Sequence, residues 1–267
     1  MVYFEDFMVN VIQALFLREL KTRFGKNRYL GYFWVVGEPL MQILVITTVI
    51  TLIREYITHL FVPGGTPVFM FLACGIIPFF MFRNIITQLM GGIAGNLSLF
   101  FYKPVRPIHV FLARTLLEFY IYSLIFVCVM ILAGWFIGYD VAPRDFLAMF
   151  SSVVLIVLSG FSFGMIFAII THFFEPLKII LTYFIVALYF LSCVIFPIWI
   201  IPSEILKYML YNPMLHICES IKHYYLVGYP LTDGINLIYP LVFNILMLFI
   251  GFWFYYYKRR ELVASRP

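Results

Sequence analysis

The chain of 267 residues is 64% hydrophobic and 12% charged, and it carries a formal net charge of +5. A soluble domain is nearer half apolar and a quarter charged, so this much apolar surface cannot be buried inside a soluble fold of this length. The apolar runs are also much longer than the alternating segments of about ten residues that build a membrane β-barrel. The composition therefore predicts an all-α integral membrane protein.

The first 29 residues predict an amphipathic helix that lies along the inner membrane surface. Between Phe4 and Phe24 apolar residues recur at helical spacing, with polar and acidic residues between them. A basic cluster follows at the depth of the lipid headgroups, and it consists of Arg18, Lys21, Arg23, Lys26 and Arg28. Two roles remain open for this cluster, because both anchoring to anionic lipid and the gathering of an acidic substrate suit it.

Six apolar runs then predict membrane-spanning helices. They cover about residues 30–53, 67–82, 111–137, 146–170, 177–199 and 236–257. The segment 201–235 is too polar for a span, too apolar for a free loop and interrupted at Asn212-Pro213, so it predicts two short re-entrant helices at the outer interface. We expect one domain over residues 1–267, made of an interfacial helix (1–29), a six-span bundle (30–257) and a tail (258–267).

The distribution of lysine and arginine predicts the orientation of this bundle. If the amphipathic helix lies inside the cell, most of the 18 basic residues fall in inner segments. The outer segments then hold Arg54, Arg144, Lys207 and Lys222. Such an excess of inner positive charge agrees with an even number of spans and with both termini in the cytoplasm. It also accounts for the net charge without any nucleic-acid partner.

The sequence contains no motif of an enzyme or a metal site. Its Gly-Lys pair, Gly25-Lys26, is followed by Asn27, so there is no phosphate-binding loop. The five histidines are scattered and the four cysteines form no C-x-x-C pair, although Cys218 lies in an expected loop where it could be a free thiol. We expect no catalytic residue and no bound metal. A membrane enzyme or an ion-coupled carrier remains open as a different class of function.

One carboxylate lies inside the first predicted span. Glu38 precedes Pro39 about eight residues into the run, where a charge is costly unless it is paired or hydrated. Two interpretations remain open: Glu38 lines a substrate pathway, or it pairs with Arg83 or Arg114 to hold spans together. In the third span Arg114 and Glu118 are four residues apart, a spacing that permits an ion pair on one helix face.

The order of motifs resembles the membrane subunit of type-2 ABC exporters, and in particular the capsular-polysaccharide export permeases of Gram-negative bacteria. The matching motifs are Arg18-Glu19-Leu20-Lys21-Thr22-Arg23, Gly31-Tyr32-Phe33-Trp34, Glu38-Pro39, Lys103-Pro104-Val105-Arg106-Pro107 and Asn212-Pro213. The resemblance implies a homodimer in the bacterial inner membrane that exports a lipid-linked, acidic polysaccharide. It also implies a separate cytoplasmic ATPase dimer that holds ATP and Mg, while this chain holds no cofactor.

Roles for individual residues follow from the same resemblance. Loops after the second and fourth spans would dock on the ATPase, through Asn96, Phe100, Lys103, Pro104, Arg106 and Glu175. Substrate entry and the pathway would use Arg18, Lys21, Arg23, Arg28, Tyr29, Tyr32, Trp34 and Glu38. Aromatic rings stack on sugar faces, but these aromatic residues also fit an ordinary interface belt. Export proteins of the periplasm and outer membrane would be further partners, and O-antigen, teichoic acid or a small amphiphile is the alternative cargo.

Overall fold

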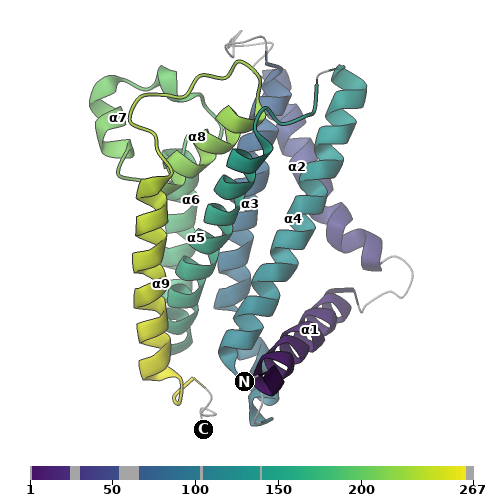
Figure 1. The fold of residues 1–267 in the computed structure, drawn as a ribbon, viewed down its shortest axis with the longest axis vertical. Coiled ribbons are helices and arrows are strands. Elements are labelled where there is room, and N and C mark those ends of the chain that lie inside the picture. Colours follow the sequence, from purple (N-terminus) through teal and green to yellow (C-terminus); the bar gives the residue numbers. More distant parts are fainter. Residues whose placement is uncertain (1, 25–30, 54–65, 103–104, 139, 263–267) are drawn as a thin grey trace.

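The computed structural model describes residues 2–24, 31–53, 66–102, 105–138 and 140–262. All regular structure in these ranges is helical, which confirms the predicted all-α fold class for the described part of the chain. The longer helices form an upright bundle (Figure 1). Helix α1 (Val2–Phe24) crosses one end of the bundle, and the short helices α7 (Ser203–Met209) and α8 (Pro213–Tyr225) lie at the other end.

Helix α3 (Val68–Met90) is the core of the bundle, and most of its side chains are buried. It packs against α4 (Pro107–Ile137) and α5 (Phe146–Phe173). Gly160 and Gly164 of α5 allow the closest approach, because a Cβ atom there would lie 3.1 Å from Ile85 and 2.9 Å from Leu89. Small residues of this kind let helix backbones come together where there is no hydrophobic driving force between helices in lipid.

Helices α2 (Gly31–Ile53) and α9 (Ile238–Lys258) flank this core and keep most of their apolar surface exposed. In α2 the exposed side chains include Met41, Val45 and Val49. Exposed apolar faces on helices of this length suit contact with lipid or with another membrane subunit. The described part of the chain therefore has the surface of a membrane protein.

The second span is longer than the sequence predicted. Helix α3 continues to Met90, past the predicted end of the span at Phe82, so Arg83 and Asn84 lie inside the helix. The Asn84 amide donates a 2.6 Å hydrogen bond to the Tyr122 hydroxyl of α4, which provides a polar partner within the bundle. The chain then turns and forms the 3-10 helix η3 (Ala94–Phe101) before α4 begins.

The fifth predicted span is shorter than expected. Helix α6 (Leu177–Leu191) has 15 residues, or roughly 22 Å, whereas the hydrocarbon core is about 30 Å thick. The single helix predicted for residues 177–199 is therefore wrong after Leu191. The Asn212 amide donates to the Leu191 carbonyl and so satisfies a terminal carbonyl of α6, a contact that sequence spacing does not reveal.

Five helices in the described residues have the length and hydropathy of a membrane span: α2, α3, α4, α5 and α9. After α6 the chain passes through Cys193, whose φ of 52° is left-handed, and reaches the short 3-10 helix η4 (Ile198–Ile200). A sixth crossing would need α6 together with this irregular segment.

Residues 201–235 contain two short helices, α7 and α8, as the sequence predicted. The break between them falls at Asn212, whose side-chain oxygen accepts a 3.0 Å hydrogen bond from the Met214 N–H and caps α8. Helix α8 packs against α3, α5 and α9, and nearly all of its side chains are buried. Cys218 is fully buried in α8 rather than placed in a loop, so the expectation of a loop thiol is wrong.

Candidate functional site

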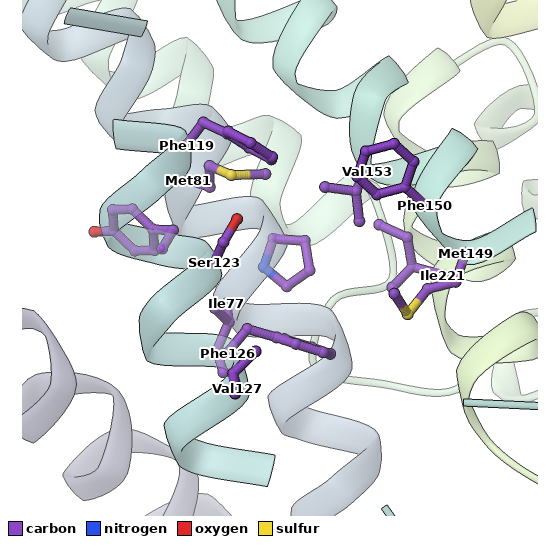
Figure 2. Close-up of a pocket in the computed structure, with 12 residues that line it drawn as sticks. Ile77, Met81, Phe119, Ser123, Phe126, Val127, Met149, Phe150, Val153 and Ile221 are labelled. Atoms are coloured by element: carbon purple, nitrogen blue, oxygen red, sulfur yellow. The ribbon is translucent and has the colours of Figure 1, made fainter. Parts of the chain in front are cut away.

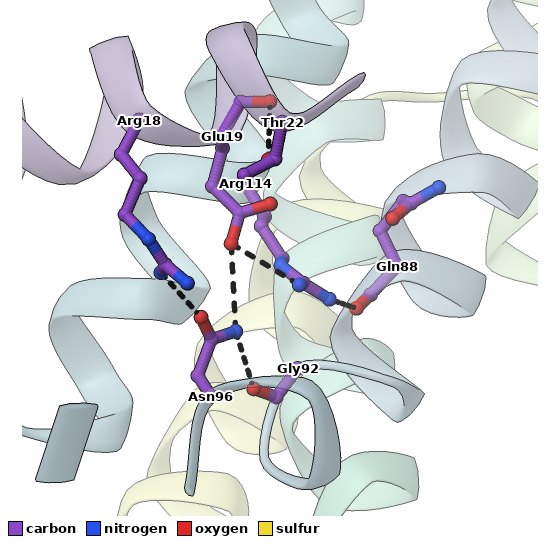
Figure 3. Close-up of polar contacts among 7 residues, drawn as sticks. All are labelled: Arg18, Glu19, Thr22, Gln88, Gly92, Asn96 and Arg114. Atoms are coloured by element: carbon purple, nitrogen blue, oxygen red, sulfur yellow. Dashed lines mark hydrogen bonds and ion pairs between the residues drawn. The ribbon is translucent and has the colours of Figure 1, made fainter. Parts of the chain in front are cut away.

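A polar cluster joins α1 to the bundle where α1 crosses it (Figure 3). Glu19 Oε1 of α1 lies 3.1 Å from Arg114 Nη2 of α4, and the two side chains are only 7% and 11% exposed. Arg114 also donates a 2.7 Å hydrogen bond to the carbonyl of Gln88 near the end of α3. This arginine therefore connects three helices, and its partner is Glu19 rather than the Glu38 considered from the sequence.

Asn96 completes this cluster from η3. Its side-chain oxygen accepts a 2.7 Å hydrogen bond from Arg18 Nη1. Its amide donates to the Gly92 carbonyl at 2.9 Å and lies 3.4 Å from the Glu19 carboxylate. We refer to Arg18, Glu19, Gln88, Asn96 and Arg114 as the junction cluster. The structure thus brings together Arg18, predicted for substrate entry, and Asn96, predicted for ATPase contact, and buries Asn96 of η3 against α1.

A polar cavity of about 390 Å³ opens between α2, α3 and α4. Its polar lining consists of Glu38, Gln42, Arg83, Asn84, Gln88, Glu118 and Tyr122. Glu38 is exposed here, and no salt bridge joins it to Arg83 in the described part of the chain. The cavity therefore leaves the Glu38 carboxylate exposed, whereas the sequence analysis considered an interhelical ion pair for it.

An aromatic cleft of about 340 Å³ lies on the other side of Arg83, between α2, α3 and α6. Phe79 and Tyr189 meet edge to face with ring centroids 5.1 Å apart. The Arg83 guanidinium lies 4.1 Å from the centroid of Phe80. Arg83 lines both the polar cavity and the aromatic cleft. Its guanidinium therefore faces aromatic rings in the cleft and hydrogen-bonding groups in the cavity. Rings stack on flat apolar faces and a guanidinium binds carboxylates, so this pair of spaces offers both kinds of contact.

A third cavity differs from these two, because it is almost entirely apolar. It measures about 230 Å³ and lies between α3, α4, α5 and α8. Figure 2 shows Phe119, Met81 and Phe126 on one side of it, with Phe150 and Val153 on the other. A charged or hydroxylated ligand would lose its water there without new hydrogen bonds, so this cavity does not suit a sugar chain.

At the opposite end of the bundle, a buried ion pair anchors α8. Lys222 Nζ donates to Glu219 Oε1 at 2.7 Å and to the Cys193 carbonyl at 2.6 Å. The Tyr229 hydroxyl donates to Glu219 Oε2 at 2.8 Å, and burial, reinforced by that carboxylate, raises the pKa of Tyr229. Every charge here has partners, so the arrangement is suited to holding α8 in place rather than to binding a ligand. No group of three metal-ligating residues occurs in the described ranges.

The structure places the remaining predicted residues in three ways. Lys21, Arg106 and Glu175 are exposed, whereas Phe100 of η3 is buried. Phe101 and Tyr102, which the sequence analysis did not select, are 75% and 67% exposed beside it. Outside the described side chains fall Arg23, Arg28, Tyr29, Tyr32, Trp34, Lys103 and Pro104.

The sequence analysis did not select Tyr189, and it considered Arg83 only as an ion-pair partner of Glu38. The signal for Arg83 was present, because an arginine within a run of apolar residues is unusual. Tyr189 gave no such signal, since tyrosine is common throughout this chain.

Comparisons with known proteins agree with a membrane transport subunit. The chain is 35% identical over 255 residues to the polysialic acid transport protein KpsM of Escherichia coli, and the match covers 95% of each chain. It is 28% identical over 244 residues to the capsule polysaccharide export inner-membrane protein CtrC of Neisseria meningitidis serogroup A, covering 90% and 88% of the two chains. BexB of Haemophilus influenzae, another capsule polysaccharide export inner-membrane protein, is 30% identical over 223 residues, with 80% and 78% covered. Residues 10–226 match the family described as ABC-2 type transporter, and the chain belongs to that family.

Proposed function

We propose that the chain is the membrane permease subunit of an ATP-driven exporter that moves a capsule polysaccharide across the bacterial inner membrane. The observation that carries this proposal is the 35% identity to a polysialic acid transport protein over 95% of both chains. The relatives named for capsule polysaccharide export support the same class of cargo. In this role the chain is a permease and not an enzyme, and a separate ATPase dimer binds ATP and Mg.

The proposed topology has six crossings and both termini in the cytoplasm. The fifth crossing consists of α6 and the irregular segment that follows it. The distribution of charge supports this orientation, because the bundle end that holds α1 and the end of α9 carries most described cations. These are Arg18, Lys21, Arg106, Lys178, Lys258, Arg259 and Arg260, whereas exposed Arg144 and Lys207 lie toward the other end.

The proposed substrate path follows the aromatic cleft and the polar cavity on either side of Arg83. Two copies of the chain would face each other across the exposed surfaces of α2 and α6 and enclose the polymer. Tyr189 and the phenylalanines of the cleft would stack on sugar rings, and Arg83 would bind acidic groups. Glu38 would then hydrogen bond to sugar hydroxyls from the polar cavity, and Lys21 would attract the lipid-linked end.

We further propose that the ATPase docks on η3 and on the turn between α5 and α6. Exposed Phe101, Tyr102 and Glu175 would make this contact, while buried Asn96 and Phe100 hold η3 against the bundle. The junction cluster would carry a displacement of η3 to α1, because Asn96 of η3 is hydrogen bonded to Arg18 and Glu19 of α1. Export proteins of the periplasm and outer membrane would receive the polymer at the end that holds α7 and α8.

The proposal is tested by two measurements in the cells that make this chain. The chain is first purified in mild detergent, and proteins that remain bound are identified by mass spectrometry. A stoichiometric cytoplasmic ATPase is expected, and its repeated absence from an intact dimeric preparation would contradict the ABC exporter. The gene is then deleted, and capsule polymer is expected to accumulate inside the cells. Normal surface polymer after deletion, with the ATPase still bound to the chain in the parent strain, would show that the cargo is different.

A further inference from the structure

A basic cavity opens between the start of α4 and the end of α9. It is lined by Arg106, Pro107, Ile108, Tyr255, Arg259 and Arg260. Its volume of about 520 Å³ greatly exceeds the roughly 30 Å³ that one water molecule occupies in the liquid. Three lining residues carry fixed positive charge and none carries negative charge, so the space has the composition of an anion site.

The three arginines have no acidic partner in the described ranges. Glu261, which is close to them in sequence, is held by Lys258 at 2.7 Å. The Arg259 guanidinium lies 4.3 Å from the Tyr256 ring centroid. Such stacking uses the face of the guanidinium and leaves its in-plane N–H groups free to donate. Like charges gathered around one space repel one another, and a bound anion would relieve this repulsion.

The backbone holds these charges at ordered positions. Arg106 is the N-cap residue of α4, and Pro107 and Ile108 begin its first turn, next to the positive end of the helix dipole. The Tyr255 hydroxyl reaches the backbone of Ile108 and so connects α9 to this turn. Beyond α9 the buried Leu262 N–H donates to the Lys258 carbonyl at 3.1 Å, which folds the segment that carries Arg259 and Arg260 back toward the bundle.

We propose that the basic cavity binds a phosphate group, supplied either by the headgroup of an anionic phospholipid or by a soluble phosphate compound. Guanidinium N–H groups match the spacing of phosphate oxygens and bind them in pairs. The positive end of α4 adds to the same field. The ends of two spanning helices also place these arginines at headgroup depth, where long basic side chains meet anionic lipid. This assignment gives Arg106 a different role from the ATPase contact predicted from the sequence.

The test uses the full chain in lipid nanodiscs, without ATPase or polymer, so its result is separate from that of the proposed function. The nanodiscs contain phosphatidylcholine with or without phosphatidylglycerol, and native mass spectrometry counts the phosphatidylglycerol that stays on the protein. The variant Arg259→Gln with Arg260→Gln is compared with a matched control, Arg144→Gln with Lys207→Gln, which removes the same charge at the opposite end. In a second arm, inorganic phosphate is added to the protein in detergent and thermal stability is measured.

If the phosphate comes from lipid, the wild type and the matched control retain phosphatidylglycerol, and the cavity variant binds it on the order of tenfold more weakly. If it comes from a soluble compound, inorganic phosphate stabilises the wild type and the matched control but not the cavity variant. Equal lipid retention by all three proteins, with no stabilisation by phosphate, would overturn the proposal. Equal losses in both variants would also overturn it, because they would indicate attraction to total charge rather than binding in the cavity.

Discussion

The carboxylate of Glu19 in α1 lies 3.1 Å from the guanidinium of Arg114 in α4, across 95 positions of sequence. Both side chains are largely buried, and each also lies near a polar group of α3 or η3. If one charge of such a buried ion pair is removed, the remaining charge stays buried without a counter-charge. This contact is therefore expected to fix α1 on the bundle.

Glu19→Gln is expected to destabilise the protein by about 3 kcal/mol, because Arg114 would keep a buried charge without its carboxylate. Thermal unfolding in detergent measures this, and a double-mutant cycle with Arg114→Gln isolates the pairwise contribution. The control is Glu261→Gln, which breaks the exposed pair with Lys258 and should cost about 0–1 kcal/mol. Equal shifts for the two glutamates would show that the buried pair does not anchor α1.

Arg83→Gln is expected to lower polymer export by about tenfold, since a lost hydrogen bond to a charged group costs roughly 1.5–3 kcal/mol. Arg83→Lys keeps the charge but loses the planar fork and should retain part of the export. Surface polymer per unit of membrane-inserted protein is the measurement, with Lys207→Gln as the control. Loss of the protein itself from the membrane would indicate that Arg83 acts in folding.

Stability is expected to fall as the pH drops below about 6.5, because of His216 in α8. Burial lowers the pKa of His216, although its bond to the Leu210 carbonyl opposes the shift. Its Nδ1 accepts the Asn236 N–H, so a second ring proton has no acceptor there. The unfolded chain therefore binds a proton on His216 more readily than the folded protein does. The folded protein has its full stability above the pKa of His216 in the unfolded chain, and it loses stability as the pH falls below that pKa.

The check is thermal unfolding in detergent at about pH 7.5 and about pH 5.5, where the protein should be less stable at the lower pH. His216→Gln keeps a donor for the Leu210 carbonyl but does not titrate, so its pH slope should be smaller. An unchanged slope in this variant would assign the pH dependence to other groups.

Cys193 and Cys218 are expected to resist thiol reagents in the folded protein. Both are fully buried, and burial raises the pKa of the Cys218 thiol to about 12. The reactive thiolate is therefore scarce at about pH 8 and has no access to solvent. Methanethiosulfonate labelling followed by mass spectrometry should modify these cysteines only after denaturation, whereas Ser203→Cys on exposed α7 should react at once. Rapid labelling of Cys218 in the folded protein would mean that α8 opens readily.

Gly75→Ala is expected to destabilise the protein by about 1–3 kcal/mol. A Cβ atom at this position would lie 2.5 Å from the Val194 carbonyl oxygen and 3.2 Å from Lys222 Cε, so the segment after α6 would have to move. At Gly95 the nearest atom, Arg114 Nη2, would be 3.7 Å away, so Gly95→Ala serves as the control. Thermal unfolding compares the two, and equal stability would show that the segment at Val194 yields without cost.

Several features of the site were visible in the sequence, but their partners were not. The spacing of Arg114 and Glu118 indicated a possible pair within one helix, whereas the structure pairs Arg114 with Glu19 on another element. Glu38 was recognised as a costly charge, and the structure places it beside a polar cavity that three helices form together. The aromatic cleft combines α3 with α6, so no local pattern could indicate it.

By itself, the sequence determined the all-helical class, the membrane surface, the positions of most spans, the break at Asn212 and the family. These features depend on hydropathy, charge and local backbone preference, which act over a few residues or a single helix. The tertiary structure alone decided where α6 ends, which charges are neutralised, and that Arg83 lies between the polar cavity and the aromatic cleft. Those outcomes depend on contacts between distant segments, such as Asn212 with Leu191 and Glu19 with Arg114, whose energies arise only when the helices pack.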